Sequence, residues 1–423
     1  MNYEETLEYI HSLHKFGIKP GLDNIKKLLM LLGNPQNNNN FVHVAGTNGK
    51  GSVSTYLSNI FIADGKKTGL FISPYVVDFK ERIQINGQYI SENSLCLITK
   101  EVKEAAEKLY TIDKTVITEF EFITAAAFLY FSKEKCDIVV LETGLGGRLD
   151  STNVIKKPLA SVITKIDFDH TAVLGDTIEK IAYEKAGIIK SNSIVITTDK
   201  QDKKALEVIK NTALSVNSEF VCVDSKDAKN ITCTEFNTQF EYKNIKLISE
   251  MPGMHQVENM SLAVQTALKL KIGELSIKSG ILRTSFPARL EVISKSPLVL
   301  LDGAHNPNGA GVLADYLKSN KISPVAVMGM MKDKDCFGVA KLIAPLCSAV
   351  FTVTVNSNQR AIPAKELANI AAEFCNRVTS FSDYDDALKK AEEISNILSV
   401  PILVCGSLYL ASDIRPILLN KFK

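Results

Sequence analysis

The chain has 423 residues, which at about 150 residues per domain predicts two or three domains. Hydrophobic residues make up 45% and charged residues 23%, as in soluble globular proteins, and a net charge of +2 gives no electrostatic argument for binding nucleic acid or an anionic membrane. The eight cysteines lack zinc-finger spacing, the N-terminal segment lacks an apolar signal core, and no apolar run approaches the roughly 20 residues that span a bilayer, so we expect a cytoplasmic protein.

Short apolar runs alternate with helical segments in the first half of the chain, which predicts an α/β fold. Strands are expected at 41–45, 68–72, 136–142, 159–166 and 193–197, and helices at 50–63, 119–133 and 177–190. The strands are almost wholly apolar, which indicates a parallel sheet with helices on both faces. Residues 34–40 (NPQNNNN) are expected as a polar loop, and residues 220–250 as a small β-rich insertion or edge.

A second α/β block begins near residue 297. Its strands are expected at 297–302, 324–330, 350–355 and 401–406, with helical patterns between them. We therefore predict a P-loop-type, mostly parallel sheet domain at 1–288, a linker at 289–296 and a smaller Rossmann-like α/β domain at 297–423.

A glycine-rich turn, GTNGKGS, joins the first strand to the first long helix. Backbone N–H groups and the helix dipole at such a turn favour phosphate. Lys50 supplies a mobile positive charge, and the hydroxyl of Ser52 suits Mg²⁺. The strict Walker pattern is not met, because Val44 stands at its first glycine and Gly51 separates Lys50 from Ser52. A turn without a ligand is the alternative, and we favour it less. The predicted phosphate-binding residues are Gly46, Thr47, Asn48, Gly49, Lys50, Gly51 and Ser52.

Polar groups follow several predicted strands, at the sheet edge where open α/β folds bind ligands. Ser73, Glu142 and His170 stand at three such ends and together could hold a divalent cation. Each alone is weak evidence, since a strand-end Glu often caps a turn and a lone His is often structural. Arg148 and Asp150, after the TGLGG turn, could meet a polar ligand or cap the turn.

The second block offers its own polar groups after the strand at 297–302. Asn306 and Pro307 form a plausible N-cap and first helical residue. Asp302 and His305 would then face outward at the end of a strand, across from the first domain. This arrangement predicts a site that is closed between two domains.

The sequence resembles folylpolyglutamate synthase, which is often also a dihydrofolate synthase and belongs to the Mur ligase superfamily. The family's motifs occur in order over nearly the whole chain, and together they are highly specific. They are HVAGTNGKGS, SPYVVDFKERIQING, LETGLGGRLDSTN, DHTAVLGDTIEKIAYEKAGIIK, GMHQVENMSLA, LDGAHNPNGA, GMMKDKD and CGSLYL. The resemblance implies that 1–288 is an ATP-binding Mur ligase-like domain and 297–423 a glutamate ligase domain.

The resemblance also implies a reaction. ATP phosphorylates the carboxylate of a folate or dihydropteroate, the amine of L-glutamate attacks the acyl phosphate, and phosphate leaves. Mg²⁺ is implied, a monovalent cation such as K⁺ is a family expectation, and we expect a monomer that acts without nucleic acid or membrane.

Roles for single residues follow from the same motifs. Lys50, Lys185 and His305 would be catalytic, and Lys185 matches a lysine that is carbamylated in the family, although its spacing alone favours an exposed helix lysine. Asn259 would lie near adenine, Arg289 near the phosphates and Asp302 near the ribose. The implied metal ligands are Ser52, Ser73, Glu142, His170 and Lys185, and the implied substrate contacts are Thr118, Phe120, Arg148 and Asp150.

Four departures from the family pattern stand out. Ala288 replaces the glycine of Pro-Gly-Arg, and SPYV replaces SPHL, which puts the role of Tyr75 in doubt. LETGLGG replaces LEVGLGG, and IDFDH replaces IGLDH. None of these changes removes a proposed ligand.

Two other functions are open. One is a Mur-type ligase that acts on a different carboxylate, such as a cell-wall precursor, and the motifs SPYVVDFKERIQING and ITEFEF favour the folate branch over it. The other is a nucleotide-binding switch without ligation, which the polar residues at three strand ends make less favoured.

Overall fold

An eight-stranded sheet organises the first part of the chain in the computed structural model, which describes residues 1–17 and 20–422. Its order is β4-β3-β2-β5-β1-β6-β7-β8. Six neighbouring strands, β2, β5, β1, β6, β7 and β8, run parallel. At one edge, β3 pairs antiparallel with β2 and forms an antiparallel hairpin with β4. The bounds are β1 Asn40–Ala45, β2 Thr68–Phe71, β3 Ile83–Ile85, β4 Gln88–Tyr89, β5 Ile138–Glu142, β6 Ala160–Ile163, β7 Ile194–Thr198 and β8 Glu219–Val223. The carboxyl ends of β5, β1 and β6 therefore lie side by side.

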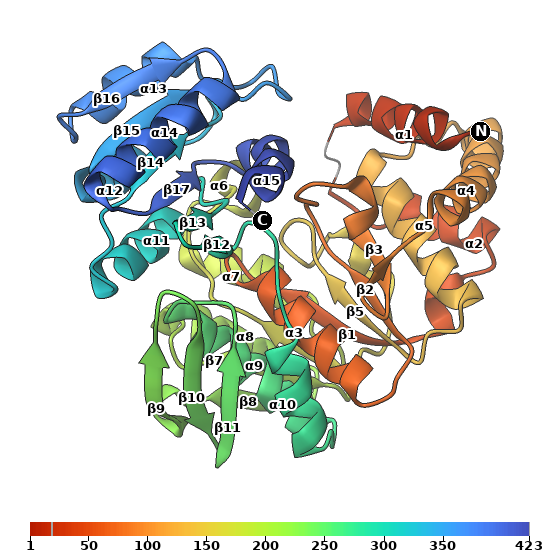
Figure 1. Ribbon diagram of the computed structural model, residues 1–423. Helices are drawn as coiled ribbons and strands as arrows, with labels where there is room; N and C mark the ends of the chain where they lie inside the picture. The colour runs from red at the N-terminus through yellow and green to blue at the C-terminus, as the bar shows by residue number, and fades with distance from the viewer. Residues whose placement is uncertain (18–19, 423) are drawn as a thin grey trace.

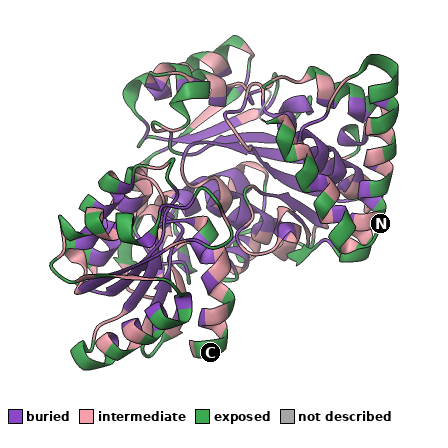
Figure 2. Ribbon diagram, turned by 90° about the horizontal axis from the view of Figure 1, so that it is seen from above, coloured by how far each residue is buried: buried purple, intermediate pink, exposed green. Residues whose placement is uncertain are grey.

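Helices cover both faces of this sheet, and the buried strands run between them (Figures 1 and 2). Alternate apolar side chains of each strand pack into different hydrophobic clusters, which is why the strands are apolar throughout. One face carries α3 (Lys50–Ala63), α9 (His255–Lys269) and α10 (Glu274–Leu282). The other carries α1 (Tyr3–Ser12), α2 (Asp23–Leu31), α4 (Glu92–Asp113), α5 (Glu119–Lys133), α7 (Ile178–Ala186) and α8 (Lys203–Ser215).

A separate three-stranded antiparallel sheet packs beside α9 and α10 (Figure 1). Its strands are β9 Ala228–Cys233, β10 Thr238–Tyr242 and β11 Ile245–Ser249. A short helix, α6 (Thr171–Leu174), follows β6. Short 3₁₀ helices lie at Leu13–Phe16, Pro35–Asn37, Phe79–Arg82, Ser151–Val154, Ser225–Asp227 and Ala344–Leu346.

The C-terminal part forms a second α/β domain around a six-stranded sheet of order β12-β13-β17-β14-β15-β16. The strands are β12 Glu291–Lys295, β13 Leu298–Leu301, β14 Val325–Met328, β15 Ala349–Val353, β16 Val378–Phe381 and β17 Ile402–Cys405. One face packs on α11 (Pro307–Ser319), α12 (Cys336–Ile343) and α13 (Ala364–Ala372), and the other on α14 (Tyr384–Leu398) and α15 (Leu408–Phe422). Only β12 is antiparallel to its neighbour.

The predicted α/β fold class is confirmed, and the helices predicted at 50–63 and 119–133 have those bounds. The predicted strands are present with ends that differ by a few residues, and the third predicted helix ends early, at Ala186. In the β-rich region at 220–250, β8 joins the large sheet, whereas β9 to β11 form their own sheet. The polar loop at 34–40 contains a 3₁₀ turn and the first residue of β1.

Part of the linker predicted at 289–296 is a strand. Residues 291–295 form β12, which pairs antiparallel with β13 at the edge of the second sheet. The chain therefore enters the second domain through a strand. The β3–β4 hairpin and β16 were not predicted from the sequence. Within the residues that the structure describes, there is no helix with both the length and the apolar character needed to cross a membrane.

Candidate active site

The glycine-rich loop after β1 has a shape that only glycine permits at two positions. Gly46 has φ of 153°, and a Cβ there would lie 1.8 Å from Oγ1 of Thr164. Gly49 has φ of 87°, and its Cβ would lie 2.4 Å from Oδ1 of Asn259. The loop leads directly into α3, whose first N–H groups have no partner within the helix. Such a helix start suits a phosphate group.

Glu142 ends β5 beside this loop and is 4% exposed. Its Oε2 accepts a hydrogen bond of 3.2 Å from the backbone N–H of Ser73. Burial raises the pKa of Glu142 to about 7, although the positive charges of Lys50 and Arg289 act to lower it. Charges from the phosphate loop and from the junction between the domains therefore converge on one carboxylate.

Lys185, in the last turn of α7, is 4% exposed, so the alternative of an exposed helix lysine is wrong. Its Nζ donates a hydrogen bond of 2.7 Å to the carbonyl oxygen of Gly46. Burial lowers the pKa of Lys185 to about 7, and the charge of Lys50 adds to this effect. The negative charges of Asp169 and Asp150 oppose it. A substantial fraction of this amine is therefore neutral near pH 7.

His170 precedes α6 with a left-handed backbone, φ 49°, and its side chain is half-exposed. Its Nε2 lies 3.7 Å from Oδ2 of Asp169. Burial lowers the pKa of His170, Asp169 raises it, and the charges of Lys334, Lys185 and Lys50 lower it further. The charge of Lys50 thus acts on His170, Glu142 and Lys185, so these groups lie near one another at the carboxyl edge of the sheet.

The predicted metal ligands form a mixed set rather than a cluster of acids and histidines. Among residues 1–17 and 20–422, no group of three or more His, Cys, Asp or Glu side chains could hold a metal ion. Any metal held by Ser52, Ser73, Glu142 and His170 would rely on two hydroxyl oxygens, one carboxylate and one imidazole nitrogen. Oxygen donors of this kind fit Mg²⁺.

The junction between the domains is a strained turn that carries Arg289. Ala288 and Leu290, on either side of it, have φ of 54° and 48°. Asp302 stabilises the turn, because its Oδ2 accepts a hydrogen bond of 2.8 Å from the N–H of Leu290. The Arg289 guanidinium stacks on Phe286 with its central carbon 5.8 Å from the ring centroid. Ala288 thus adopts a left-handed backbone, which glycine adopts more readily than alanine.

His305 follows β13 in the second domain. Its Nδ1 lies 2.9 Å from the carbonyl oxygen of Gly303, so the tautomer with a proton on Nδ1 is assigned. Burial lowers the pKa of His305, as do the charges of Lys334 and Arg289. Lys334 therefore acts on both His170 and His305, although its motif GMMKDKD suggested no role for it.

The predicted substrate residues surround the TGLGG turn. The Phe120 ring packs against Gly144, where a Cβ would lie 2.4 Å from Cζ. The buried carboxylate of Asp150 accepts a hydrogen bond of 2.8 Å from the N–H of Leu145. Thr118 caps α5. Arg148 is engaged elsewhere, because its guanidinium pairs with Glu184 at 2.8 Å.

Arg82 is a charged residue beside the site to which the sequence analysis assigned no role. Its guanidinium stacks on the rings of Tyr75 and Phe79, 5.1 and 5.5 Å from their centroids. Its Nε is enclosed and has no hydrogen-bond partner among the described residues. Burial lowers the pKa of Arg82, and the groups that raise it include Glu119, Glu142 and Tyr409 of the second domain. The motif KERIQING contained this residue but gave no sign of its burial.

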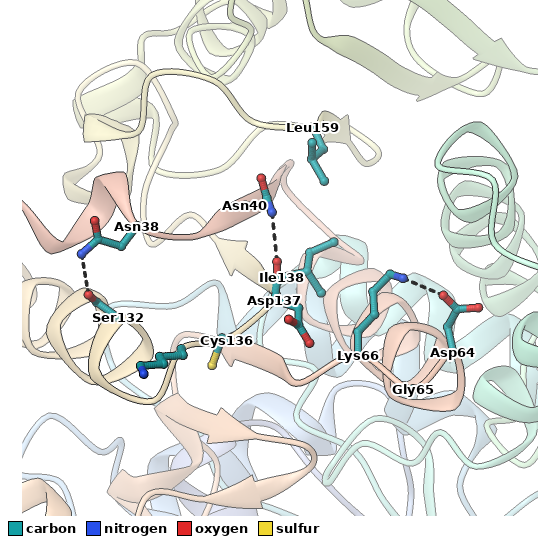
Figure 3. Close-up of a pocket in the computed structure, with 11 residues that line it drawn as sticks. Asn38, Asn40, Asp64, Gly65, Lys66, Ser132, Cys136, Asp137, Ile138 and Leu159 are labelled. Carbon is teal, nitrogen blue, oxygen red and sulfur yellow. Dashed lines mark hydrogen bonds and ion pairs between the residues drawn. The ribbon is translucent and has the colours of Figure 1, made fainter.

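A separate cavity lies at the other end of the sheet. It has a volume of about 870 Å³ at the amino ends of β1 and β5, opposite the phosphate loop (Figure 3). Its polar groups bond to each other: Nδ2 of Asn40 donates to the carbonyl of Asp137 at 3.1 Å, and Lys66 pairs with Asp64 at 2.8 Å. This cavity is separate from the site described above.

Comparison with known proteins places both domains in one class. Residues 44–267 match the Mur ligase middle domain, and residues 288–408 match the Mur ligase glutamate ligase domain. The fold and the phosphate loop are both those of ATP-dependent ligases that join an acid to an amino acid.

Relatives that match along their whole length narrow this class. Dihydrofolate synthase/folylpolyglutamate synthase of Bacillus subtilis is 37% identical over 432 residues, with 98% of each chain covered. Folylpolyglutamate synthase of Lacticaseibacillus casei is 35% identical, with 99% of each covered. Structures of Mycobacterium tuberculosis folylpolyglutamate synthase complexed with ADP and AMPPCP superpose with a TM-score of 0.89 at 28% identity over 99% of each chain. The chain belongs to the folylpolyglutamate synthase and dihydrofolate synthase family, which confirms the predicted resemblance.

Proposed function

We propose that this ligase joins L-glutamate to the carboxylate of a folate through an acyl phosphate, and that it accepts dihydropteroate as well. The observation that carries the proposal is the convergence of charge on Glu142. Lys50, on the phosphate loop, and Arg289, at the junction of the domains, both act on this buried carboxylate. A nucleotide held by both lobes and a substrate acid would therefore meet in one crevice.

The chain's own residues account for phosphoryl transfer. The N–H groups of the 46–52 loop bind the phosphates, and Lys50 offsets the charge that collects on their oxygens in the transition state. Arg289 and Lys334 approach from the junction and the second domain and add positive charge there. A carboxylate is a poor electrophile, and phosphorylation supplies it with a leaving group.

The donors Ser52, Ser73, Glu142 and His170 would hold Mg²⁺, with Lys185 as a further ligand. When bound, the ion would neutralise charge on the phosphate and acyl oxygens. Lys185 can bind a cation only if it loses its positive charge. Its lowered pKa supports carbamylation, in which the neutral amine adds to CO₂ and releases a proton to leave an anionic carbamate. Activation by a monovalent cation such as K⁺ stays an expectation from the family.

The amine of glutamate must lose protons as it attacks. His305 is suited to accept one, because its Nδ1 is assigned the proton and donates to Gly303, which leaves a lone pair on Nε2. Arg82 suits a carboxylate of one of the substrates, because its guanidinium is positively charged and the residue is only partly buried. Phe120, Thr118 and Asp150 would contact the pterin.

A purified-enzyme assay tests the proposal. ADP release is measured with dihydropteroate and with tetrahydrofolate, each with and without L-glutamate. We expect release that depends on both glutamate and a folate substrate, and product analysis by mass spectrometry shows which acceptors gain a glutamate. Use of a nucleotide-linked muropeptide with no use of folates would contradict the proposal, as would ATP hydrolysis that is indifferent to both substrates.

A further inference from the structure

One side chain of the second domain binds the two loops that build the nucleotide site. Asn308, at the second residue of α11, accepts a hydrogen bond of 2.7 Å at Oδ1 from Nδ2 of Asn48 in the phosphate loop. Its own Nδ2 donates to Oδ2 of Asp167, in the loop that leads from β6 to His170. We propose that Asn308 is a positioning residue that couples the docking of α11 to the shape of the phosphate loop.

The two loops are also bound to each other. Oγ1 of Thr47 donates to the carbonyl oxygen of Asp167 at 2.9 Å, and the N–H of Asp167 lies 2.9 Å from the same Oγ1. Oγ1 of Thr164 donates to the carbonyl oxygen of Asn48 at 2.7 Å. A shift of Asn308 therefore acts on a connected set of groups that extends from the phosphate loop to the segment bearing His170.

Asp167 supplies the side-chain acceptor on which this link depends. It stands where the family pattern IGLDH has glycine, and glycine offers no side-chain acceptor to Asn308. While α11 is docked, the amide of Asn48 and the carboxylate of Asp167 share one partner. If the second domain moved away, both groups would lose this partner. Nucleotide affinity and domain docking are thus coupled through differential contacts in the two states.

A second contact of the same helix provides a matched control. The hydroxyl of Tyr316 donates a hydrogen bond of 2.9 Å to the carbonyl oxygen of Glu235, between β9 and β10. This contact also joins α11 to the first domain, but it touches neither the phosphate loop nor the loop of Asp167. Its loss should weaken docking without altering the nucleotide site directly.

Exchange of the two polar groups tests the proposal. N308D places a carboxylate against Asp167, whereas D167N leaves an acceptor for Asn308. The combined variant N308D/D167N restores a hydrogen bond with donor and acceptor exchanged. We expect N308D to weaken AMPPCP binding and raise KM for ATP by about tenfold, the scale of a lost hydrogen bond to a charged group. D167N should change these quantities little, and the combined variant should recover to within about threefold of the wild type.

The controls show whether Asn308 affects nucleotide affinity through the phosphate loop or only helps to hold α11 against the first domain. Y316F should lower AMPPCP affinity by clearly less than N308D does, because it weakens docking without touching the phosphate loop, and D167N should not restore it. N308A should resemble N308D if the charged variant is too unstable to purify. Wild-type behaviour of N308D and N308A, no recovery in the combined variant, or the same loss of affinity in Y316F would each overturn the proposal. AMPPCP binding by calorimetry needs no acceptor substrate, so this result can be read even if folates prove not to be substrates.

Discussion

Lys185 donates a hydrogen bond of 2.7 Å from Nζ to the carbonyl oxygen of Gly46, which ties the last turn of α7 to the first residue of the phosphate loop. The two residues are 139 positions apart in the sequence. This contact places a buried amine with a lowered pKa against the loop proposed to bind the triphosphate. The chemistry of Lys185 and the shape of the loop therefore depend on each other.

Gly46→Ala should damage the fold as well as the site. Its Cβ would lie 1.8 Å from Oγ1 of Thr164, at a φ that L-residues rarely adopt. We expect a loss of about 2–4 kcal/mol in the free energy of unfolding from strain and overpacking, measured by urea denaturation, with no AMPPCP binding. Gly311→Ala is the control, since among the described residues nothing lies within 4 Å of its Cβ. That helix substitution should stabilise by about 0.5–1 kcal/mol. Normal stability of Gly46→Ala would contradict the structure of the loop.

Lys50→Ala should remove turnover but preserve the fold. Loss of one group that stabilises transition-state charge typically costs about 10²–10³-fold in kcat. Because Lys50 is only partly buried, we expect the thermal unfolding midpoint to change little. ADP release and circular dichroism measure the two effects. Lys66→Ala, at the opposite end of the sheet, should behave as wild type. Retained activity of Lys50→Ala would exclude Lys50 from the mechanism.

His170→Ala should weaken the dependence on Mg²⁺. The neutral imidazole lies with Lys50 and Lys185 at the site, where the predicted ligand set contains few alternative donors. We expect the Mg²⁺ concentration for half-maximal ADP release to rise about tenfold or more, as for loss of a metal contact. Asp176→Ala, a nearby exposed position paired with Lys180, is the control. A titration of His170→Ala that overlays the wild type would argue against a ligand role.

Arg82→Met should impair binding of an acidic substrate. Methionine keeps apolar bulk beside Tyr75 and Phe79 but removes the positively charged guanidinium. We expect KM for glutamate or for the folate to rise at least about tenfold, in line with a lost charge-assisted hydrogen bond, with KM for ATP nearly unchanged. The exposed Arg283→Met serves as control. An equal rise in all three KM values would indicate a structural effect only.

Protonation of the buried His43 should lower the free energy of unfolding in acid. The side chain is fully buried on β1, with Nε2 2.9 Å from Oγ1 of Thr152, and burial lowers its pKa from 6.5 to about 3. Because the pKa of His43 is lower in the folded state than in the unfolded state, the stability that neutral His43 contributes is complete above pH 6.5. It is lost as the pH falls toward 3. Glutamine at position 43 cannot titrate. Between pH 7 and 4 the wild type should therefore lose about 3 kcal/mol more unfolding free energy than His43→Gln. Unfolding free energies from urea denaturation that fall equally with pH in the wild type and in His43→Gln would refute this prediction.

Local sequence determined the elements and the identity of the phosphate loop. The bounds of α3 and α5 were predictable because Gly49 starts one helix in a left-handed conformation and Thr118 forms a capping box with Glu121 at the other. The apolar strands fixed the fold class, since runs without polar alternation require cover on both faces. These features depend on residues a few positions apart, which is why the sequence alone sufficed.

Only the tertiary structure decided the electrostatics of the site and the links between its domains. Spacing favoured an exposed Lys185, but packing buries it beside Lys50 and Gly46. Neither the enclosed Nε of Arg82 nor the contact of Asn308 with Asn48 could be predicted, because each depends on neighbours brought together by the fold. Burial and charge proximity are sums over distances in space, and residues separated by hundreds of positions contribute to them as strongly as neighbours in the chain.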